Sequence, residues 1–107
     1  MTIAHVLFPP SYLQRDAWFA SAQPQLIAAH QDNRYQTAGV IEVGELRGEA
    51  AADECFDLTN NPGRQDQRDQ AWPRRRSISV GDIVHVDGQT FLCQSVGWVE
   101  ISKSAES

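Results

Sequence analysis

The stretch that decides the fold lies near the C-terminus and reads Val80-Gly81-Asp82-Ile83-Val84-His85-Val86-Asp87-Gly88-Gln89-Thr90-Phe91-Leu92-Cys93. The β-branched run 83–86 and the segment 90–93 have the composition of strands. Asp87-Gly88 between them is a strong hairpin signal, because both residues tolerate a positive φ. The residues before the run predict a corner, with Gly81 at positive φ. We therefore expect an antiparallel hairpin that is entered through a turn.

The longest helix is expected before this stretch, over residues 45–59. Four residues there have the i, i+3, i+4, i+7 spacing of an apolar helical face: Ala52, Cys55, Phe56 and Thr59. The spacing predicts that Phe56 packs in the core. The polar segment 63–73 is predicted to be an exposed loop that Trp72 anchors.

The N-terminal third predicts a strand, a helical segment and a second strand. Residues 2–8 are apolar, and Pro9-Pro10 ends them because neither proline can donate to a strand ladder. Pro24 suits the first turn of a helix. In the second strand, 35–43, Gly39 indicates a bulge or a close backbone approach.

The order of these segments predicts an α+β fold. We expect a small antiparallel sheet of four or five strands with two or three helices packed on one face. At 107 residues the chain has the length of a single domain. Within it, a strand and helical segment at 1–34 precede the main part at 35–101, and 102–107 is expected to be a frayed tail.

The composition excludes several kinds of protein. The chain has no run of about 18 apolar residues, and its N-terminus lacks a basic leader followed by an apolar segment. We therefore expect a cytoplasmic protein that does not bind a membrane. Cys55 and Cys93 are isolated, and His5, His30 and His85 lie in unrelated segments, so we expect reduced buried thiols, no metal and no cofactor.

The net charge of −5 is unevenly distributed along the chain. Residues 64–76 carry five arginines and two aspartates, whereas an acidic face is predicted from Glu42, Glu45, Glu49, Asp53, Glu54 and Asp57. Such segregation can steer a partner of complementary charge. The acidic residues are either a solvated helix face or a mimic of a phosphate row, as in small inhibitors of DNA-binding machinery.

The partner-binding surface is predicted on the basic segment and the corner after it, at Arg64, Arg68, Trp72, Arg74, Arg75, Arg76, Ser77, Ser79 and Asp82. Arginine binds phosphate or carboxylate with two parallel hydrogen bonds, and an exposed indole can stack on a base. Two alternatives remain open at this stage. Ser79 and Asp82 either bind a partner or hold the turn, and Asn60 either recognises a ligand or ends its helix in a left-handed conformation.

Several islands of sequence resemble those of one family. They are Phe56 with Leu58-Thr59-Asn60, then Trp72, then the run from Arg76 to Val84, and finally Gly97-Trp98. Together they are similar to the pattern of a family of small hypothetical proteins carried by plasmids, phages and other mobile elements. The resemblance covers about residues 35–101 and implies a genomic neighbourhood rather than a mechanism.

We expect a non-catalytic binding protein of a mobile element that acts by protein–protein contact, for example as an anti-defence or maintenance factor. No catalytic constellation is visible in the sequence. One alternative is a nucleic-acid-binding module that uses the arginine-rich segment, although such domains are usually basic over a whole face. A second is a small enzyme with a carboxylate or cysteine centre, which would need Cys55 or Cys93 exposed beside a histidine.

Overall fold

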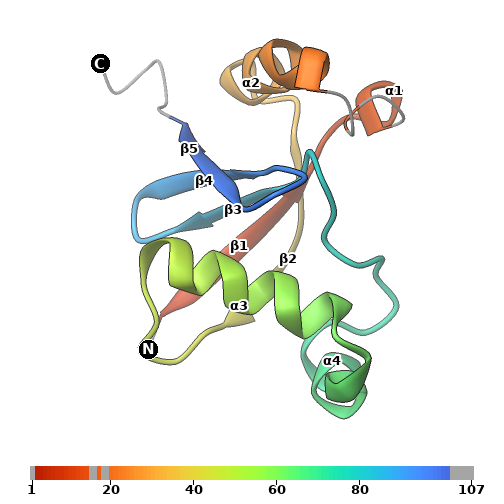
Figure 1. Ribbon diagram of the computed structural model, residues 1–107, viewed down its shortest axis with the longest axis vertical. Helices are drawn as coiled ribbons and strands as arrows, with labels where there is room; N and C mark the ends of the chain where they lie inside the picture. Colours follow the sequence, from red (N-terminus) through yellow and green to blue (C-terminus); the bar gives the residue numbers. More distant parts are fainter. Residues whose placement is uncertain (1, 15–16, 18–19, 102–107) are drawn as a thin grey trace.

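The computed structural model describes residues 2–14, 17 and 20–101 and has an α+β fold (Figure 1). Its described residues form a five-stranded antiparallel sheet with the strand order β2-β1-β3-β4-β5, which confirms the expected class. The expected tail at 102–107 lies outside the described residues. In chain order the elements are β1 (Ile3–Phe8), α1 (Ser11–Gln14), η1 (Ala20–Ala22), α2 (Gln23–Gln31), β2 (Gln36–Glu42), α3 (Gly48–Asn60), η2 (Pro62–Arg64), α4 (Gln65–Ala71), β3 (Ile83–Val86), β4 (Gln89–Cys93) and β5 (Trp98–Ile101).

The hairpin forms as the sequence predicts. β3 and β4 pair antiparallel along their length, and Asp87 and Gly88 in the turn have φ values of 53° and 77°. Two consecutive positive values fit the type I′ turn, whose twist matches that of the strands. Gly81 at the preceding corner has φ of 95°, also as expected.

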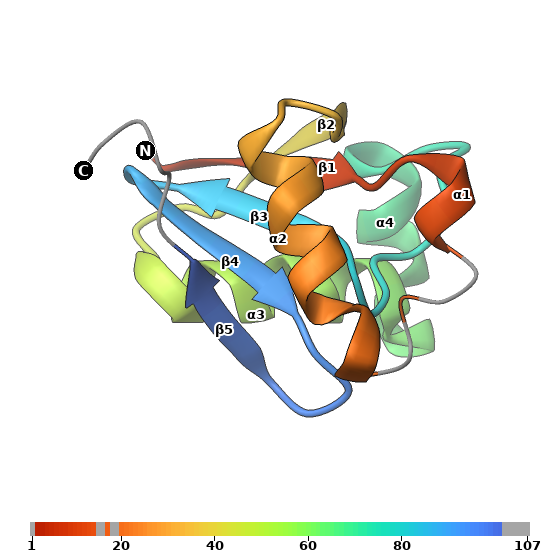
Figure 2. The same cartoon turned by 90° about the horizontal axis from the view of Figure 1, so that it is seen from above.

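Helices cover both faces of the sheet (Figure 2). On one face, α3 contributes to a core that includes Cys55, Leu58, Val6, Val84 and Phe91. On the other, α1 and α2 contribute to a second core that includes Leu13, Leu26, Ala29, Ile83 and Leu92. Neighbouring residues in a strand point to opposite faces, so the consecutive apolar pairs in β3 and β4 require cover on both sides. The expectation of helices on one face accounts for α3 but not for α1 and α2.

Residues 63–73 are not the exposed loop that the sequence predicts. They complete η2 and form α4, and Trp72 comes next with none of its surface exposed. The indole N–H of Trp72 donates to the Arg76 carbonyl at 2.8 Å. No residue of α4 is buried. The apolar periodicity that marks an amphipathic helix is therefore missing from its sequence.

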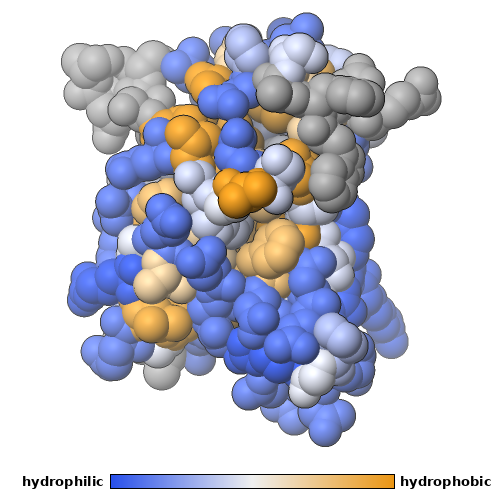
Figure 3. All heavy atoms as spheres, viewed as in Figure 1, coloured by the Kyte–Doolittle hydropathy of each residue, from blue (hydrophilic) through white to orange (hydrophobic). Residues whose placement is uncertain are grey.

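The helix α3 begins at Gly48 and buries Ala51, Ala52, Cys55, Leu58 and Thr59. Phe56 is 38% exposed, so its expected place in the core is wrong. Each helical residue turns about 100°, which puts Phe56 on the flank of a face centred on Cys55. Its ring instead meets Trp98 edge to face. Figure 3 shows the side of the molecule on which α3 lies, and apolar side chains are visible on its surface.

The sequence predicts a bulge or a close backbone approach at Gly39, and the structure has the bulge beside it and the close approach at Gly39 itself. The register of β1 against β2 shifts after Val6, which leaves Ala38 as an extra residue in a bulge. A Cβ atom at Gly39 would lie 2.8 Å from the Trp72 ring. The bare backbone of β2 therefore lets the residue that anchors α4 approach the sheet.

Candidate functional site

Two of the arginines predicted to bind a partner brace the protein instead. Arg68 donates hydrogen bonds to the carbonyls of Thr59 at 3.0 Å and Arg75 at 2.7 Å. Arg75 donates from Nε to the Ala38 carbonyl at 2.7 Å, and its guanidinium lies 5.1 Å from the centre of the Trp72 ring. These side chains fasten the segment after α4 to the end of α3 and to β2.

Asp82 is fully buried, so its predicted contact with a partner is wrong. The Arg76 guanidinium donates to both of its carboxylate oxygens, at 2.7 and 2.8 Å, and the Ser79 amide donates at 2.8 Å. Burial raises the pKa of Asp82, although the hydrogen bonds from Arg76 and Ser79 act in the opposite direction. Of the two alternatives for Ser79 and Asp82, the structure therefore shows the turn-holding one.

Ser77 and Asn60 are also used within the fold. The Ser77 hydroxyl donates to the Thr59 carbonyl at 2.6 Å. The Asn60 amide donates to the carbonyls of Phe56 at 3.0 Å and Ile78 at 2.9 Å. Asn60 is the last residue of α3 and has no positive φ, so the expected left-handed conformation is wrong. Its amide nevertheless ends the helix by bonding its own backbone, as one alternative predicts.

Trp72 and Arg74 have opposite surroundings, because Trp72 is buried and Arg74 is exposed. Because Trp72 is buried, it cannot stack on a base, and its predicted binding role is wrong. Arg74 is exposed at φ 61°, and within the described part of the chain no hydrogen bond or ion pair involves its side chain. Among the three consecutive arginines 74–76, Arg74 alone has a guanidinium that no described residue engages.

The predicted acidic face is divided among three segments. Glu42 lies in β2 and Glu45 in the turn before α3, whereas the other four carboxylates belong to α3. Arg64 forms ion pairs with Glu54 at 2.7 Å and Asp57 at 2.9 Å. One basic residue of the predicted site therefore neutralises part of the acidic set.

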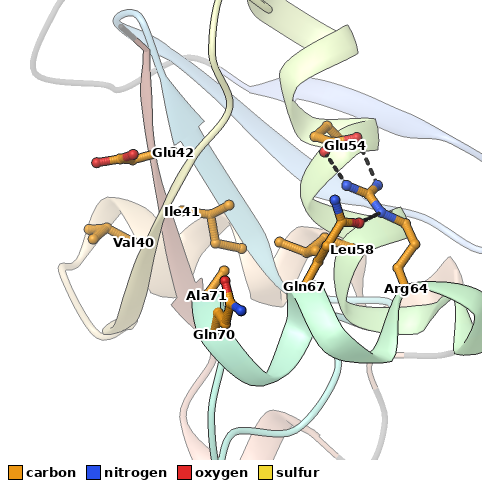
Figure 4. Close-up of a pocket in the computed structure, with 9 residues that line it drawn as sticks. All are labelled: Val40, Ile41, Glu42, Glu54, Leu58, Arg64, Gln67, Gln70 and Ala71. Carbon is orange, nitrogen blue, oxygen red and sulfur yellow. Dashed lines mark hydrogen bonds and ion pairs between the residues drawn. The ribbon is translucent and has the colours of Figure 1, made fainter.

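A groove of about 550 Å³ lies between β2, α3 and α4 (Figure 4), lined by Val40, Ile41, Glu42, Glu54, Leu58, Arg64, Gln67, Gln70 and Ala71. The side chains of Ile41 and Leu58 point toward each other and make an apolar floor. The ion pair of Arg64 with Glu54 closes one side. The amide side chains of Gln67 and Gln70, both in α4, lie at the rim of the groove.

The main chain of an open sheet edge borders this groove. β2 pairs with β1 on one side and with no other described strand on its second side. The Val43 amide donates to the Thr2 carbonyl, so by alternation the N–H and C=O groups of Glu42 and Val40 face outward. Their side chains point away from the floor, so both residues meet the groove with their backbone (Figure 4). Such outward groups are a template for another strand.

The open length of this edge is short. Arg75 occupies the Ala38 carbonyl, and the bulge at Ala38 bends the strand away from regular pairing. The accessible part is therefore confined to residues 40–42. A single short strand fits this length, whereas extended edge-to-edge association does not.

Sequence reasoning missed most of the residues that build the groove. It identified Arg64, Glu42 and Glu54, but assigned them to two separate surfaces. The other six lining residues belong to neither predicted surface: Val40, Ile41, Leu58, Gln67, Gln70 and Ala71. The spacing of the last three, i, i+3 and i+4, puts them on one face of a helix, but the segment was predicted to be a loop.

The geometry argues against the alternative of a cysteine enzyme. Cys55 and Cys93 are both free and buried. Burial raises the pKa of each thiol to about 12, so neither supplies a thiolate nucleophile near neutral pH. In the described part of the chain, no group of three or more His, Cys, Asp or Glu residues could hold a metal ion.

Comparisons of this chain with protein-family models, with curated proteins and with solved structures found no match. The resemblance to small proteins of mobile elements therefore stays a prediction. Among the described helices, none is both long enough and apolar enough to cross a membrane.

Proposed function

We propose that this protein is a non-catalytic binding protein that captures an extended segment of a partner protein along the edge of β2. The observation that carries the proposal is the outward main chain of β2 beside a groove with an apolar floor. Adding a strand to an exposed edge is a recurring mode of peptide recognition, in which main-chain hydrogen bonds give affinity and side-chain pockets give specificity.

The groove suits one short strand. An incoming segment would pair with the main chain of Val40 and Glu42, and its side chains would alternate between the two faces of the sheet. The inward side chain would cover Ile41 and Leu58 and should be apolar. On the rim, Gln70 offers an amide donor and acceptor to polar atoms of the segment, and Gln67 offers its amide N–H groups, because its oxygen accepts from Nε of Arg64 at 2.6 Å.

The nucleic-acid alternative receives less support from the structure. The indole expected to stack on bases is buried, and Arg68, Arg75 and Arg76 donate to groups within the protein. Arg74 remains, but one arginine is a small electrostatic footprint for a protein of net charge −5.

The biological setting also belongs to the proposal. We propose a cytoplasmic accessory protein of a plasmid, phage or other mobile element, with an anti-defence or maintenance role. The sequence islands around Asn60, Gly81 and Trp98 support this setting. Sequencing of the flanking genes tests it, because genes of conjugation, replication or phage assembly should lie beside the gene for this protein.

Selection from a library of random seven-residue peptides tests capture by the groove. We expect enriched peptides with an apolar residue at alternate positions. They should shift the backbone NMR signals of residues 40–42. The substitution Ala71→Arg places a large side chain at the lining of the groove and should weaken these peptides about tenfold, or 1.4 kcal/mol.

Gln65→Arg is the matched control, because it adds the same charge to α4 at a residue outside the groove. It should bind the selected peptides like the unmodified protein. Peptides that bind the Ala71→Arg variant as well as they bind the unmodified protein would refute capture in the groove. A library that yields no binder would do the same.

A further inference from the structure

A small apolar surface lies on a different side of α3 from the groove. Phe56 is 38% exposed, and its ring meets that of Trp98 edge to face, with centres 6.4 Å apart and planes at 89°. Val96, in the turn before β5, is 90% exposed. The space-filling view shows apolar side chains over the middle of α3 and the β4–β5 connection, with hydrophilic ones around them (Figure 3). We call Phe56, Val96 and Trp98 the aromatic platform.

The two rings of the platform are held in place by contacts within the fold. The indole N–H of Trp98 donates to Oδ1 of Asp53 at 2.7 Å, and β5 fixes the Trp98 backbone by pairing it with Cys93. Phe56 comes three residues after Asp53, so one helical turn supplies both the second ring and the carboxylate. A surface that is already ordered loses little conformational entropy when it binds a partner.

Carboxylates border the platform along α3. Glu49, Asp53 and Asp57 succeed each other at intervals of four residues, about 6 Å apart along the helix axis, and all three are exposed. Arg64 pairs with Asp57, but no cation of the described residues forms an ion pair with Glu49 or Asp53. The surroundings of the aromatic rings therefore attract positive charge.

We propose that the aromatic platform is a second interaction surface, which binds a lysine- or arginine-bearing segment of a partner protein. A cation that lies over an aromatic ring is attracted by the ring's negative face, and a neighbouring carboxylate adds a charge-assisted hydrogen bond. The aliphatic stem of the same side chain covers Val96. A nucleic acid is disfavoured here, because its phosphates would meet the carboxylates of α3.

This surface does not depend on the proposed groove. It uses the outward face of α3 and the start of β5, whereas the groove uses β2, α4 and the opposite flank of α3. A partner can therefore occupy either surface without the other. The two proposals also fail independently, since each predicts NMR changes in its own set of residues.

A titration monitored by ¹⁵N NMR tests the platform. The probe is an acetylated and amidated peptide of alternating arginine and leucine, and the control probe replaces each arginine by glutamate. We expect the arginine peptide to shift the Trp98 indole signal and the amides of residues 49–57 with saturation. We expect the glutamate peptide to shift neither. Binding should weaken when salt is raised to about 0.5 M, because exposed charges are screened.

Three variants separate the contributions to this binding. Phe56→Ser removes the exposed ring and should weaken the arginine peptide at least about threefold. Asp53→Asn keeps an oxygen that accepts the indole N–H but removes the charge, and it should also weaken binding. Tyr12→Ser removes an aromatic residue that is 61% exposed in α1, away from the platform, and should leave binding unchanged.

Four outcomes would overturn the inference. They are equal shifts with both peptides, shifts confined to residues 40–42, binding that Phe56→Ser leaves intact, and signals that move on dilution without any peptide. The second outcome would place the peptide in the groove. The fourth would make the platform a contact between copies of this chain.

Discussion

Gly81 lies at the corner that orients the hairpin, and two independent constraints act on it. Its φ of 95° is strained for any residue with a side chain. A Cβ atom there would also collide with the Cβ of Ala17, far inside van der Waals contact. The Tyr35 hydroxyl donates to its carbonyl at 2.7 Å, which fixes the corner to the N-terminal half of the chain.

We expect Gly81→Ala to reduce the free energy of unfolding by about 2–5 kcal/mol, from backbone strain and overpacking together. Gly88→Ala is the matched control, because Gly88 has φ of 77° but nothing within 4 Å of an added Cβ. It should cost only about 1–2 kcal/mol. Urea denaturation of both variants measures the difference, and equal losses would contradict the role assigned to Ala17.

At the scale of the element, α3 and α4 depend on different kinds of contact. α3 is amphipathic and packs its buried face on the sheet. α4 has no buried residue and is held by two other kinds of contact. Trp72, directly after the helix, enters the core, and the guanidinium of Arg68, in the middle of the helix, donates to the Thr59 carbonyl before α4 and the Arg75 carbonyl after it. The position of α4, and with it one wall of the groove, therefore rests on Trp72.

We expect Trp72→Ala to lower the free energy of unfolding by about 3–5 kcal/mol, because it empties a fully buried site. Phe56→Ala should cost about 1 kcal/mol, as for a partly exposed side chain. Thermal unfolding monitored by circular dichroism compares the two. If Phe56→Ala proves the more damaging substitution, the packing assigned to α3 is wrong.

At the scale of the whole molecule, buried ionisable groups make the free energy of unfolding depend on pH in the alkaline range. The thiols of Cys55 and Cys93 ionise near pH 9 when exposed, and burial raises the pKa of each to about 12. Burial also raises the pKa of Tyr35. Between these values the unfolded chain loses protons that the folded protein keeps, so stability falls as pH rises.

We expect the free energy of unfolding to decline between about pH 9 and pH 11, by up to about 1.4 kcal/mol per pH unit for each buried thiol. Urea midpoints measured at several pH values test this. The double variant Cys55→Ala, Cys93→Ala should have a shallower decline, whatever its stability at pH 7. An unchanged slope in that variant would show that the thiols do not cause the effect.

Local signals in the sequence determined the hairpin, the proline-initiated α2, the bulge next to Gly39 and the positive φ at Gly81. These features arise from residues close together in the chain, since turn chemistry and strand alternation act over a few positions. The α+β class is a consequence of the order of the elements. At Ser79 and Asp82 the sequence left two alternatives open, and the hydrogen bonds of the folded chain decided for the turn.

Only the tertiary structure decided which charged groups face a partner. The same arginine side chain can bind phosphate or brace its own backbone, and the outcome depends on carbonyls and carboxylates distant in sequence, such as Ala38 for Arg75. Likewise, the groove joins β2 to α4, which α3 separates in the chain, and its open backbone exists because β2 ends the sheet. Edges and through-space pairs are properties of the assembled fold, so no local pattern specifies them.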